Sequence, residues 1–439
     1  MRSRLLLAAA VVLGLSQIGY ADDWPQWLGP KRDSVWRETG IVKEFPADGP
    51  PVKWRVPVKL GYSGPAVADG RVYVFDYDKE SGDIKNSPGG RNELTGRERV
   101  LCLSAETGEE IWKYEYDRPY NLSYAAGPRC TPTVEGGKVY TLGAEGDLIC
   151  LTADSGELVW RKDLTAEYNT TAPIWGFSSH PLVEGDLLYC VVGGKGSVAV
   201  AFNKNTGEEV WRALSAEPQG YCPPTMIEYD GTKQLLIWHP QSLNSLNPQT
   251  GEVYWTVPLQ PAYEMSIIAP RQLDDLLFAS GIGRVGVMLK LKEGKPGVSE
   301  LWRGKTKMAV YSAEATPILE DGMIYGVDCH DGALVGARIE DGKRLWETRE
   351  PTSGGKRRAD HGTAFLVKQD DRFFLFSETG DLIIAKLSPE GYEEISRFHA
   401  IEPTNEAFGR PVVWAHPAFA EKSAFIRNDK EIICVDFAE

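Results

Sequence analysis

Six tryptophans recur along this 439-residue chain at a nearly constant interval, and five of them lie four residues after a glycine. The copies of this pattern are Gly108 with Trp112, Gly156 with Trp160, Gly207 with Trp211, Gly251 with Trp255, and Gly342 with Trp346. Two copies are degenerate, because Trp302 follows Gly297 by five residues and Ile395 stands where a tryptophan is expected after Gly391. Positions 112, 160, 211, 255, 302, 346 and 395 lie 44–51 residues apart. That period is typical of a four-stranded β-propeller blade.

Each part of the repeat has a physical task in such a blade. The glycine tolerates the positive φ of a tight hairpin, and the Asp, Asn or Thr before it can bond to the turn backbone. We expect the tryptophan to begin the outer strand and to wedge its ring between neighbouring blades.

A second marker, a proline followed by an apolar strand and an Asp/Gly-Gly turn, counts the blades independently. Openings of this kind start at residues 65, 132, 181 and 317, with weaker ones at 224, 270 and 417, and Gly362-Thr363 stands in for the remaining one. The last opening is followed by two strands before the chain stops, so its outer strand must come from elsewhere. The segment around Trp54 fits that place. We therefore predict an all-β, eight-bladed propeller of four-stranded antiparallel blades over 52–439, its last blade closed by the N-terminal strand.

Three segments lie outside the repeat. Residues 1–21 have the basic start, short apolar run and small residues of a signal peptide, with cleavage expected after Ala21. Residues 22–51 form an arm that we expect to lie across one face. Residues 78–99 are a polar, Gly-rich insertion in the first blade, which predicts a surface loop. With no later apolar stretch of membrane-spanning length, the mature protein is expected to be periplasmic or secreted.

Charge and cysteine content narrow the function classes. The formal net charge of −14 disfavours nucleic-acid binding, because an acidic surface repels phosphates. The seven cysteines are an odd number and include no adjacent pair. Cys102, Cys150 and Cys434 occupy one repeat position inside apolar strands, which favours packing over disulfide bonds.

The segments that lead into the innermost strands should crowd around one mouth of the central channel. Polar side chains in these segments make a small-ligand site a hypothesis, although a wet propeller mouth needs polar residues for solvation alone. The candidate residues are Arg129, His180, Tyr221, Glu314, Arg358, Asp360, His361 and His416. No metal site is predicted, since the run Cys329 to Gly332 is interpreted as a hairpin turn. No catalytic residue can be chosen either.

The repeat resembles that of the bacterial PQQ-binding-like β-propeller proteins, whose Ala-x-Asp-x-x-x-Gly-x-x-x-Trp motif matches the copies above. The resemblance covers the mature chain and implies two kinds of function. One is a non-catalytic scaffold similar to the propeller subunit of the outer-membrane protein assembly machinery. The other is a quinoprotein dehydrogenase that holds pyrroloquinoline quinone (PQQ) and calcium in the channel and oxidises alcohols or sugars.

The chain departs from the dehydrogenase pattern. It lacks the adjacent cysteine pair of those enzymes and a Cys-x-x-Cys-His haem motif, and it is shorter than they are. The leading hypothesis is therefore an exported, non-catalytic scaffold without a cofactor that binds protein partners or a ligand at the channel mouth. The alternative is a PQQ-dependent dehydrogenase, in which a mouth Asp or Glu acts as base and Arg129 or Arg358 lies near the quinone.

Overall fold

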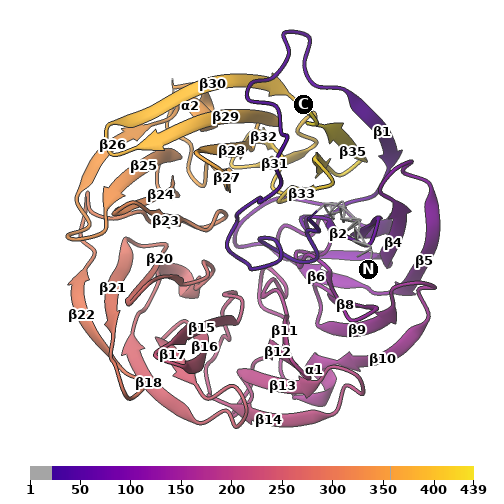
Figure 1. Ribbon diagram of the computed structural model, residues 1–439. Coiled ribbons are helices and arrows are strands. Elements are labelled where there is room, and N and C mark those ends of the chain that lie inside the picture. The colour runs from indigo at the N-terminus through magenta and orange to yellow at the C-terminus, as the bar shows by residue number, and fades with distance from the viewer. Residues whose placement is uncertain (1–21, 356) are drawn as a thin grey trace, which may run out of the picture.

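A computed structural model describes residues 22–355 and 357–439, which form a ring of eight antiparallel blades around a central channel (Figure 1). The predicted fold class is confirmed. The predicted signal peptide, residues 1–21, lies outside the described residues.

Each blade runs from a short inner strand to an outer strand at the rim. In chain order, the first four blades are β2 (Ala66–Ala68), β3 (Arg71–Ser81), β4 (Asn92–Ser104) and β5 (Glu110–Asp117); β7 (Thr133–Glu135), β8 (Lys138–Leu142), β9 (Asp147–Thr152) and β10 (Leu158–Asp163); β11 (Leu182–Glu184), β12 (Leu187–Val191), β13 (Ala199–Asn203) and β14 (Glu209–Ala213); and β15 (Thr225–Tyr229), β16 (Thr232–His239), β17 (Ser242–Leu246) and β18 (Val253–Pro258).

The second half of the ring repeats this order. Its blades are β19 (Arg271–Leu273), β20 (Leu276–Gly281), β21 (Val285–Leu291) and β22 (Val298–Arg303); β23 (Ile318–Glu320), β24 (Met323–Asp328), β25 (Ala333–Arg338) and β26 (Arg344–Thr348); β27 (Ala364–Gln369), β28 (Arg372–Ser377), β29 (Asp381–Ser388) and β30 (Gly391–His399); and β33 (Ala418–Ala420), β34 (Ser423–Arg427) and β35 (Glu431–Asp436) with β1 (Val52–Pro57). The connections hold three short helical turns, α1 (Leu164–Glu167), η1 (Ala262–Glu264) and α2 (Glu350–Ser353). Among the described residues, no helix has the length and apolar sequence needed to span a bilayer.

The N-terminal strand closes the ring as predicted. β1 pairs antiparallel with β35, with Trp54 opposite Cys434 and Val56 opposite Ile432. The terminal blade thereby gains its fourth strand, and no incomplete blade is left at the junction between the chain ends to template aggregation.

The tryptophans hold neighbouring blades together. The Trp112 indole N–H donates to the carbonyl oxygen of Ala153 in the next blade at 2.9 Å, and its ring packs on the backbone of Gly156. Among the described residues, the same bond to the following blade is formed by Trp54, Trp160, Trp211, Trp302 and Trp346. Trp255 differs, because its indole donates to Gln234 within its own blade.

The seventh blade lacks the tryptophan, and the register corrects the predicted position. In β30 the bulge skips Ile395, so that Ser396 pairs with Ile384 at the place that the tryptophan occupies in other blades. The N-terminal arm occupies the space that the missing tryptophan ring leaves beside Ser396. The backbone N–H of Phe45 donates to Ser396 Oγ at 3.0 Å, and its ring packs edge-on against Phe398.

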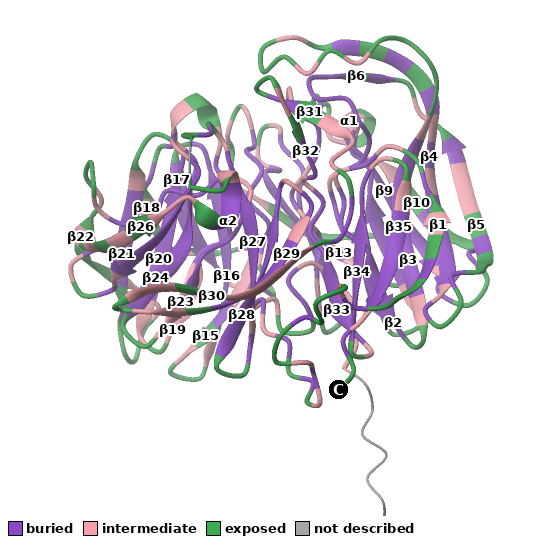
Figure 2. Ribbon diagram, turned by 90° about the horizontal axis from the view of Figure 1, so that it is seen from above, coloured by how far each residue is buried: buried purple, intermediate pink, exposed green. Residues whose placement is uncertain are grey.

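The insertion at 78–99 is mostly strand rather than loop. β3 and β4 extend into it, and β6 (Tyr120–Leu122) pairs with the start of β4, which leaves residues 82–91 as the connecting loop. Tyr77 and Tyr120 stack at 4.0 Å between ring centroids and stiffen this extension. In Figure 2, β6 stands on the same face as the two-stranded hairpin of β31 (Asn405–Ala407) and β32 (Arg410–Val412).

The arm crosses the channel and contacts several blades on its way. Trp24 bridges to Val67 of β2, and Val35 bridges to Lys368 of β27. The arm is the indigo segment that passes over the centre of the ring in Figure 1. Between these two bridges, the half-buried Arg32 guanidinium donates to the carbonyl oxygens of Pro181 and Pro224, which lead into two further blades. The arm thus straps several blades together and narrows one end of the channel.

Candidate functional site

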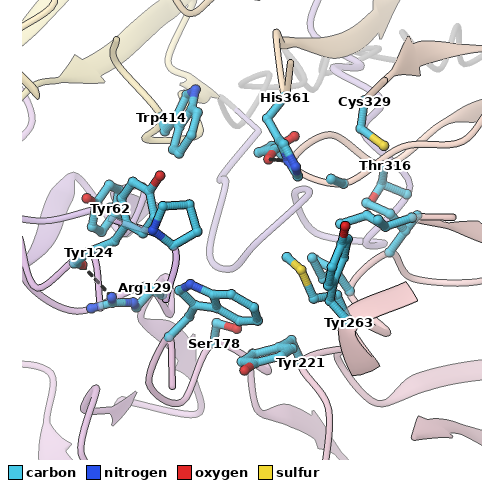
Figure 3. Close-up of a pocket in the computed structure, with 18 of the residues that line it drawn as sticks. Tyr62, Tyr124, Arg129, Ser178, Tyr221, Tyr263, Thr316, Cys329, His361 and Trp414 are labelled. Carbon is cyan, nitrogen blue, oxygen red and sulfur yellow. Dashed lines mark hydrogen bonds and ion pairs between the residues drawn. The ribbon is translucent and has the colours of Figure 1, made fainter. Parts of the chain in front are cut away.

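The segments that enter the blades surround a cavity of about 920 Å³ at the channel mouth (Figure 3). Seven of the eight predicted site residues line it: Arg129, His180, Tyr221, Glu314, Asp360, His361 and His416. The eighth, Arg358, is exposed and is not part of the wall. Both Arg358 and Asp360 lie in the connection between α2 and β27, but Asp360, which is nearer to β27, lines the cavity.

Trp27 of the arm contributes to the cavity beside His180. The two rings stack at 4.6 Å between centroids with an interplanar angle of 7°. Nδ1 of His180 accepts the backbone N–H of Thr131 at 3.0 Å, which requires that nitrogen to be unprotonated. Burial, together with the nearby charge of Arg32, holds the pKa of His180 well below its ordinary value.

His416 is a second neutral imidazole. Its Nδ1 lies 3.0 Å from the carbonyl oxygen of Pro417, to which it donates, and burial lowers its pKa to about 4. His180 and His416 therefore add polar but uncharged surface near neutral pH.

Arg129 is a cation without a carboxylate partner among the described residues. Its guanidinium donates to the carbonyl oxygens of Ser123 at 3.0 Å and Tyr124 at 2.5 Å, and to that of Gly127. It also lies over the Tyr62 ring, 5.2 Å from the centroid. Backbone oxygens and an aromatic face thus hold the guanidinium in place while leaving its charge unneutralised by an acid.

A carboxylate–imidazole pair lies on another part of the wall. His361 Nδ1 is 2.7 Å from Glu314 Oε1, and the imidazole stacks on the Phe408 ring at 4.9 Å with an interplanar angle of 3°. Burial alone would lower the pKa of His361, but the charge and hydrogen bond of Glu314 outweigh it and raise the pKa. The pair favours an imidazolium–carboxylate arrangement, with Nε2 left free of Glu314.

Aromatic residues with left-handed backbone gather in this one cavity. Tyr124, Tyr263, His361 and Phe408 have φ values of 49°, 56°, 57° and 50°, and all four line it. Every other non-glycine residue of the described chain with positive φ has a non-aromatic side chain. Bulky residues rarely adopt this conformation, and such strain concentrates at ligand clamps. Tyr263 is also 79% exposed.

The insertion and the β31–β32 hairpin form the part of the cavity wall on the face where β6 stands (Figure 2). Pro88 and Gly89 of the insertion line the cavity, and so does Phe408 at the hairpin tip. The two segments are tied together by Asn86, whose amide donates to Asn405 Oδ1 at 2.7 Å.

The run after β24 forms the predicted hairpin turn, with Gly332 N–H donating to the carbonyl oxygen of Asp328 at 2.9 Å. Asp328, Cys329 and His330 nevertheless place three possible metal-ligand atoms within 4.8 Å of one another. Both Asp328 oxygens are engaged, one by His330 at 3.0 Å and the other by Arg344. A metal would have to displace these partners, so the geometry favours turn and ion pair over a metal centre.

The cavity does not fit a quinone-bound calcium ion. Calcium takes six to eight oxygen ligands. Glu314 and Asp360 are the carboxylates among the lining residues, which include no Asn or Gln. Glu314 is already bonded to His361. All seven cysteines are free and buried, with none adjacent to another.

Sequence reasoning missed most of the aromatic wall. Besides Tyr221, the cavity is lined by Trp27, Tyr62, Tyr124, Trp175, Tyr263, Phe365, Phe408 and Trp414. Most of these residues lie outside the periodic pattern, in the arm, the blade entries and the connecting loops, whereas Phe365 lies in the inner strand β27. The sequence does contain a signal for this wall, because aromatic residues occur repeatedly in these segments outside the repeat.

The family model described as outer membrane protein assembly factor BamB matches residues 96–348 and 241–439. None of the curated proteins compared matches the sequence. BamB from Moraxella catarrhalis is similar in structure, with a TM-score of 0.57 at 15% identity over 88% of this chain and 97% of that one.

Two enzymes share the fold at comparable similarity. Quinohemoprotein alcohol dehydrogenase from Comamonas testosteroni has a TM-score of 0.61 at 12% identity, over 95% of this chain and 81% of that one. A europium-containing methanol dehydrogenase has a TM-score of 0.57 at 13% identity, over 94% and 89%. At such identities these likenesses describe the fold alone. The family match covers more than half of the sequence, and this chain therefore belongs to the family of the outer membrane protein assembly factor BamB.

Proposed function

We propose that the protein is an exported, non-catalytic propeller that binds an organic ligand in the mouth cavity. One observation carries the proposal: the aromatic residues held in left-handed backbone, Tyr124, Tyr263, His361 and Phe408, all line that cavity. Strained aromatic side chains around a concave site are typical of a ligand clamp.

Export is supported by the signal-peptide pattern of residues 1–21 and by the family description, which names an outer membrane protein assembly factor. The expected location is the periplasm or the exterior. Amino-terminal sequencing of protein from the culture medium and the periplasm tests this, with a mature chain starting at Asp22 as the expected result.

A scaffold role toward protein partners is the second part of the proposal. It is supported by the family description and by the closed ring, whose faces need no further strand to complete the fold. Cross-linking in intact cells followed by mass spectrometry tests it, and cross-links confined to copies of this chain would contradict it.

The alternative, a PQQ-dependent dehydrogenase with calcium, finds less support in the side chains of the cavity. Glu314 would be the candidate base and Arg129 the cation near the quinone. The lining residues, however, lack an oxygen cage for calcium and an adjacent cysteine pair. Purified protein titrated with PQQ and Ca²⁺, with absorbance and dye-linked alcohol oxidation as readouts, separates the two functions. Saturable binding with turnover would overturn the non-catalytic proposal.

Ligand binding itself is tested by the exposed clamp residue Tyr263. We expect Tyr263→Ala, at a position 79% exposed, to weaken binding of any cavity ligand. Tyr254→Ala, at a half-buried position of the outer strand β18 away from the cavity lining, should leave binding unchanged.

A further inference from the structure

We propose that the ligand of the mouth cavity is an uncharged saccharide of about two rings, held between aromatic faces and recognised through its hydroxyl groups. This inference rests on the proposed function, since it names the class of ligand that the same cavity takes.

The charges that face the cavity favour a neutral ligand. Arg129 and the imidazolium form of His361 contribute positive charge, and Glu314 and Asp360 contribute negative charge. A multiply charged anion would gain from the first two and be repelled by the other two. Burying an unpaired charge costs far more than burying a hydrogen-bonded hydroxyl, so a neutral, polar molecule fits this balance better.

The aromatic side chains provide flat apolar faces at the entrance as well as inside. Tyr263 is 79% exposed and Phe408 is 42% exposed, although both line the cavity. They come from segments far apart in the chain, η1 and the β31–β32 hairpin. In Figure 3, Tyr263 and His361 project toward the same space from different sides. A pyranose ring presents C–H faces that pack on aromatic rings, and hydroxyl groups around its edge that need polar partners.

Polar groups of both kinds are available to those hydroxyls. The Arg129 guanidinium carries five N–H groups, and the carbonyl oxygens of Ser123, Tyr124 and Gly127 accept three hydrogen bonds from it. N–H groups therefore remain for a ligand. The Glu314 carboxylate retains Oε2 as an acceptor, and His361 retains Nε2. A hydroxyl both donates and accepts, so it can pair with each of them. A rigid aromatic ligand without hydroxyls would leave most of these groups unpaired.

The volume is consistent with a ligand of this size. Cavities of about 300–1,000 Å³ hold drug-sized ligands. A disaccharide is in that size class, and the cavity has about 920 Å³.

The test uses the purified mature protein and isothermal titration calorimetry with three sets of probes: uncharged mono-, di- and trisaccharides, the aromatic acid PQQ, and an apolar naphthalene dye. Saturation-transfer NMR on the bound probe then identifies which protons face aromatic rings. We expect saturable binding of at least one uncharged saccharide, with transfer to its ring C–H protons.

Two variants distinguish cavity binding from surface adsorption. Tyr263→Ala should weaken saccharide binding by about three- to tenfold, the range for loss of one aromatic contact, while Tyr254→Ala leaves it unchanged. Phe408→Ala serves as a second cavity variant if Tyr263→Ala unfolds the protein. Equal affinities for wild type and both cavity variants would overturn the inference.

The probes separate failure of this inference from failure of the proposed function. Binding of PQQ or the dye in the cavity, without binding of any saccharide, would overturn the saccharide class and leave the ligand-binding function standing. Absence of binding by all three sets would overturn both.

Discussion

The Trp27 indole of the N-terminal arm stacks on the His180 imidazole at the mouth cavity, with ring centroids 4.6 Å apart and planes 7° apart. A residue that precedes the propeller thus completes a site whose other walls come from the blades. The contact also excludes water from His180, which is one reason why the pKa of this imidazole is depressed by burial.

Removing that ring should be visible at His180. In Trp27→Ala, water reaches the imidazole, and we expect its pKa to rise toward the ordinary histidine value. An NMR titration of the histidine side chains measures the change. Phe408→Ala is the control, because Phe408 stacks on His361 instead. An unchanged pKa of His180 in Trp27→Ala would contradict the assigned role of Trp27.

The wedge between blades predicts a steric effect at Gly156. A Cβ at this position would lie 2.5 Å from Trp112 Cε3, and φ is +70°. Gly156→Ala should lower the free energy of unfolding by two effects, the strain of an alanine at positive φ and the clash of its Cβ with Trp112. The clash should add about 1–3 kcal/mol to the loss caused by the backbone strain. Gly136→Ala is the matched control, since φ is +59° and no atom lies within 4 Å of the added Cβ. Chemical denaturation measures both, and equal losses would rule out the wedge.

Glu98 predicts a pH dependence of stability. Its buried carboxylate accepts hydrogen bonds from Tyr116, from Tyr120 at 2.6 Å and from Ala144 N–H at 2.8 Å, yet burial raises its pKa to about 7. The folded state therefore binds this proton more tightly than the unfolded state. The stabilising contribution is complete below the unfolded pKa and is lost as pH rises through about 7.

The expected loss is about 3 kcal/mol in the free energy of unfolding between pH 4.5 and pH 7. Glu98→Gln removes the titrating group, so the stability of this variant should fall less over that window than the wild type does. Glu93→Gln, at an exposed position of the same strand, should retain the full dependence. Parallel pH profiles for wild type and Glu98→Gln would refute the assignment.

The pair of Glu314 and His361 predicts a shift of opposite sign from that at His180. In Glu314→Gln the imidazolium loses its carboxylate, so burial dominates and the pKa of His361 should fall. Asp360→Asn, which removes a weaker electrostatic contribution, should lower it less. Histidine NMR titrations of the two variants provide the comparison. Equal shifts would show that the 2.7 Å contact is not the main cause.

The ring could be predicted because its determinants are local and repeated. Each Gly-to-Trp unit combines a turn that needs positive φ with a ring that needs a neighbouring blade, and the unmatched final opening indicated closure by the segment around Trp54. Prediction failed where pairing departs from the repeat. Within 78–99, residues 78–81 pair with 95–97 as an extension of the β3–β4 hairpin, and only residues 92–94 gain a more distant partner, β6; a polar, Gly-rich stretch reveals neither pairing. Ser396 occupies the tryptophan position because the bulge that precedes the tryptophan in other blades falls at Ile395 in this one, five rather than four residues separating Gly391 from the paired position.

The site divides in the same way. Strand-entry position alone was enough to select seven residues of the cavity wall, since a closed ring brings equivalent positions of every blade to one mouth. Arg358 is the exception, because it lies farther from β27 than Asp360 and His361 in the same connection and does not line the wall. The amino-acid order by itself thus determined the blade count, the closing strand and the ring of mouth residues, because each follows from short-range turn chemistry repeated at a constant interval. Only the tertiary structure decided that Trp27 crosses the channel to His180 and that Tyr263 and Phe408 join the same cavity. Those contacts join the arm, η1 and the β31–β32 hairpin, which are not parts of the repeat. Their packing depends on the complete ring.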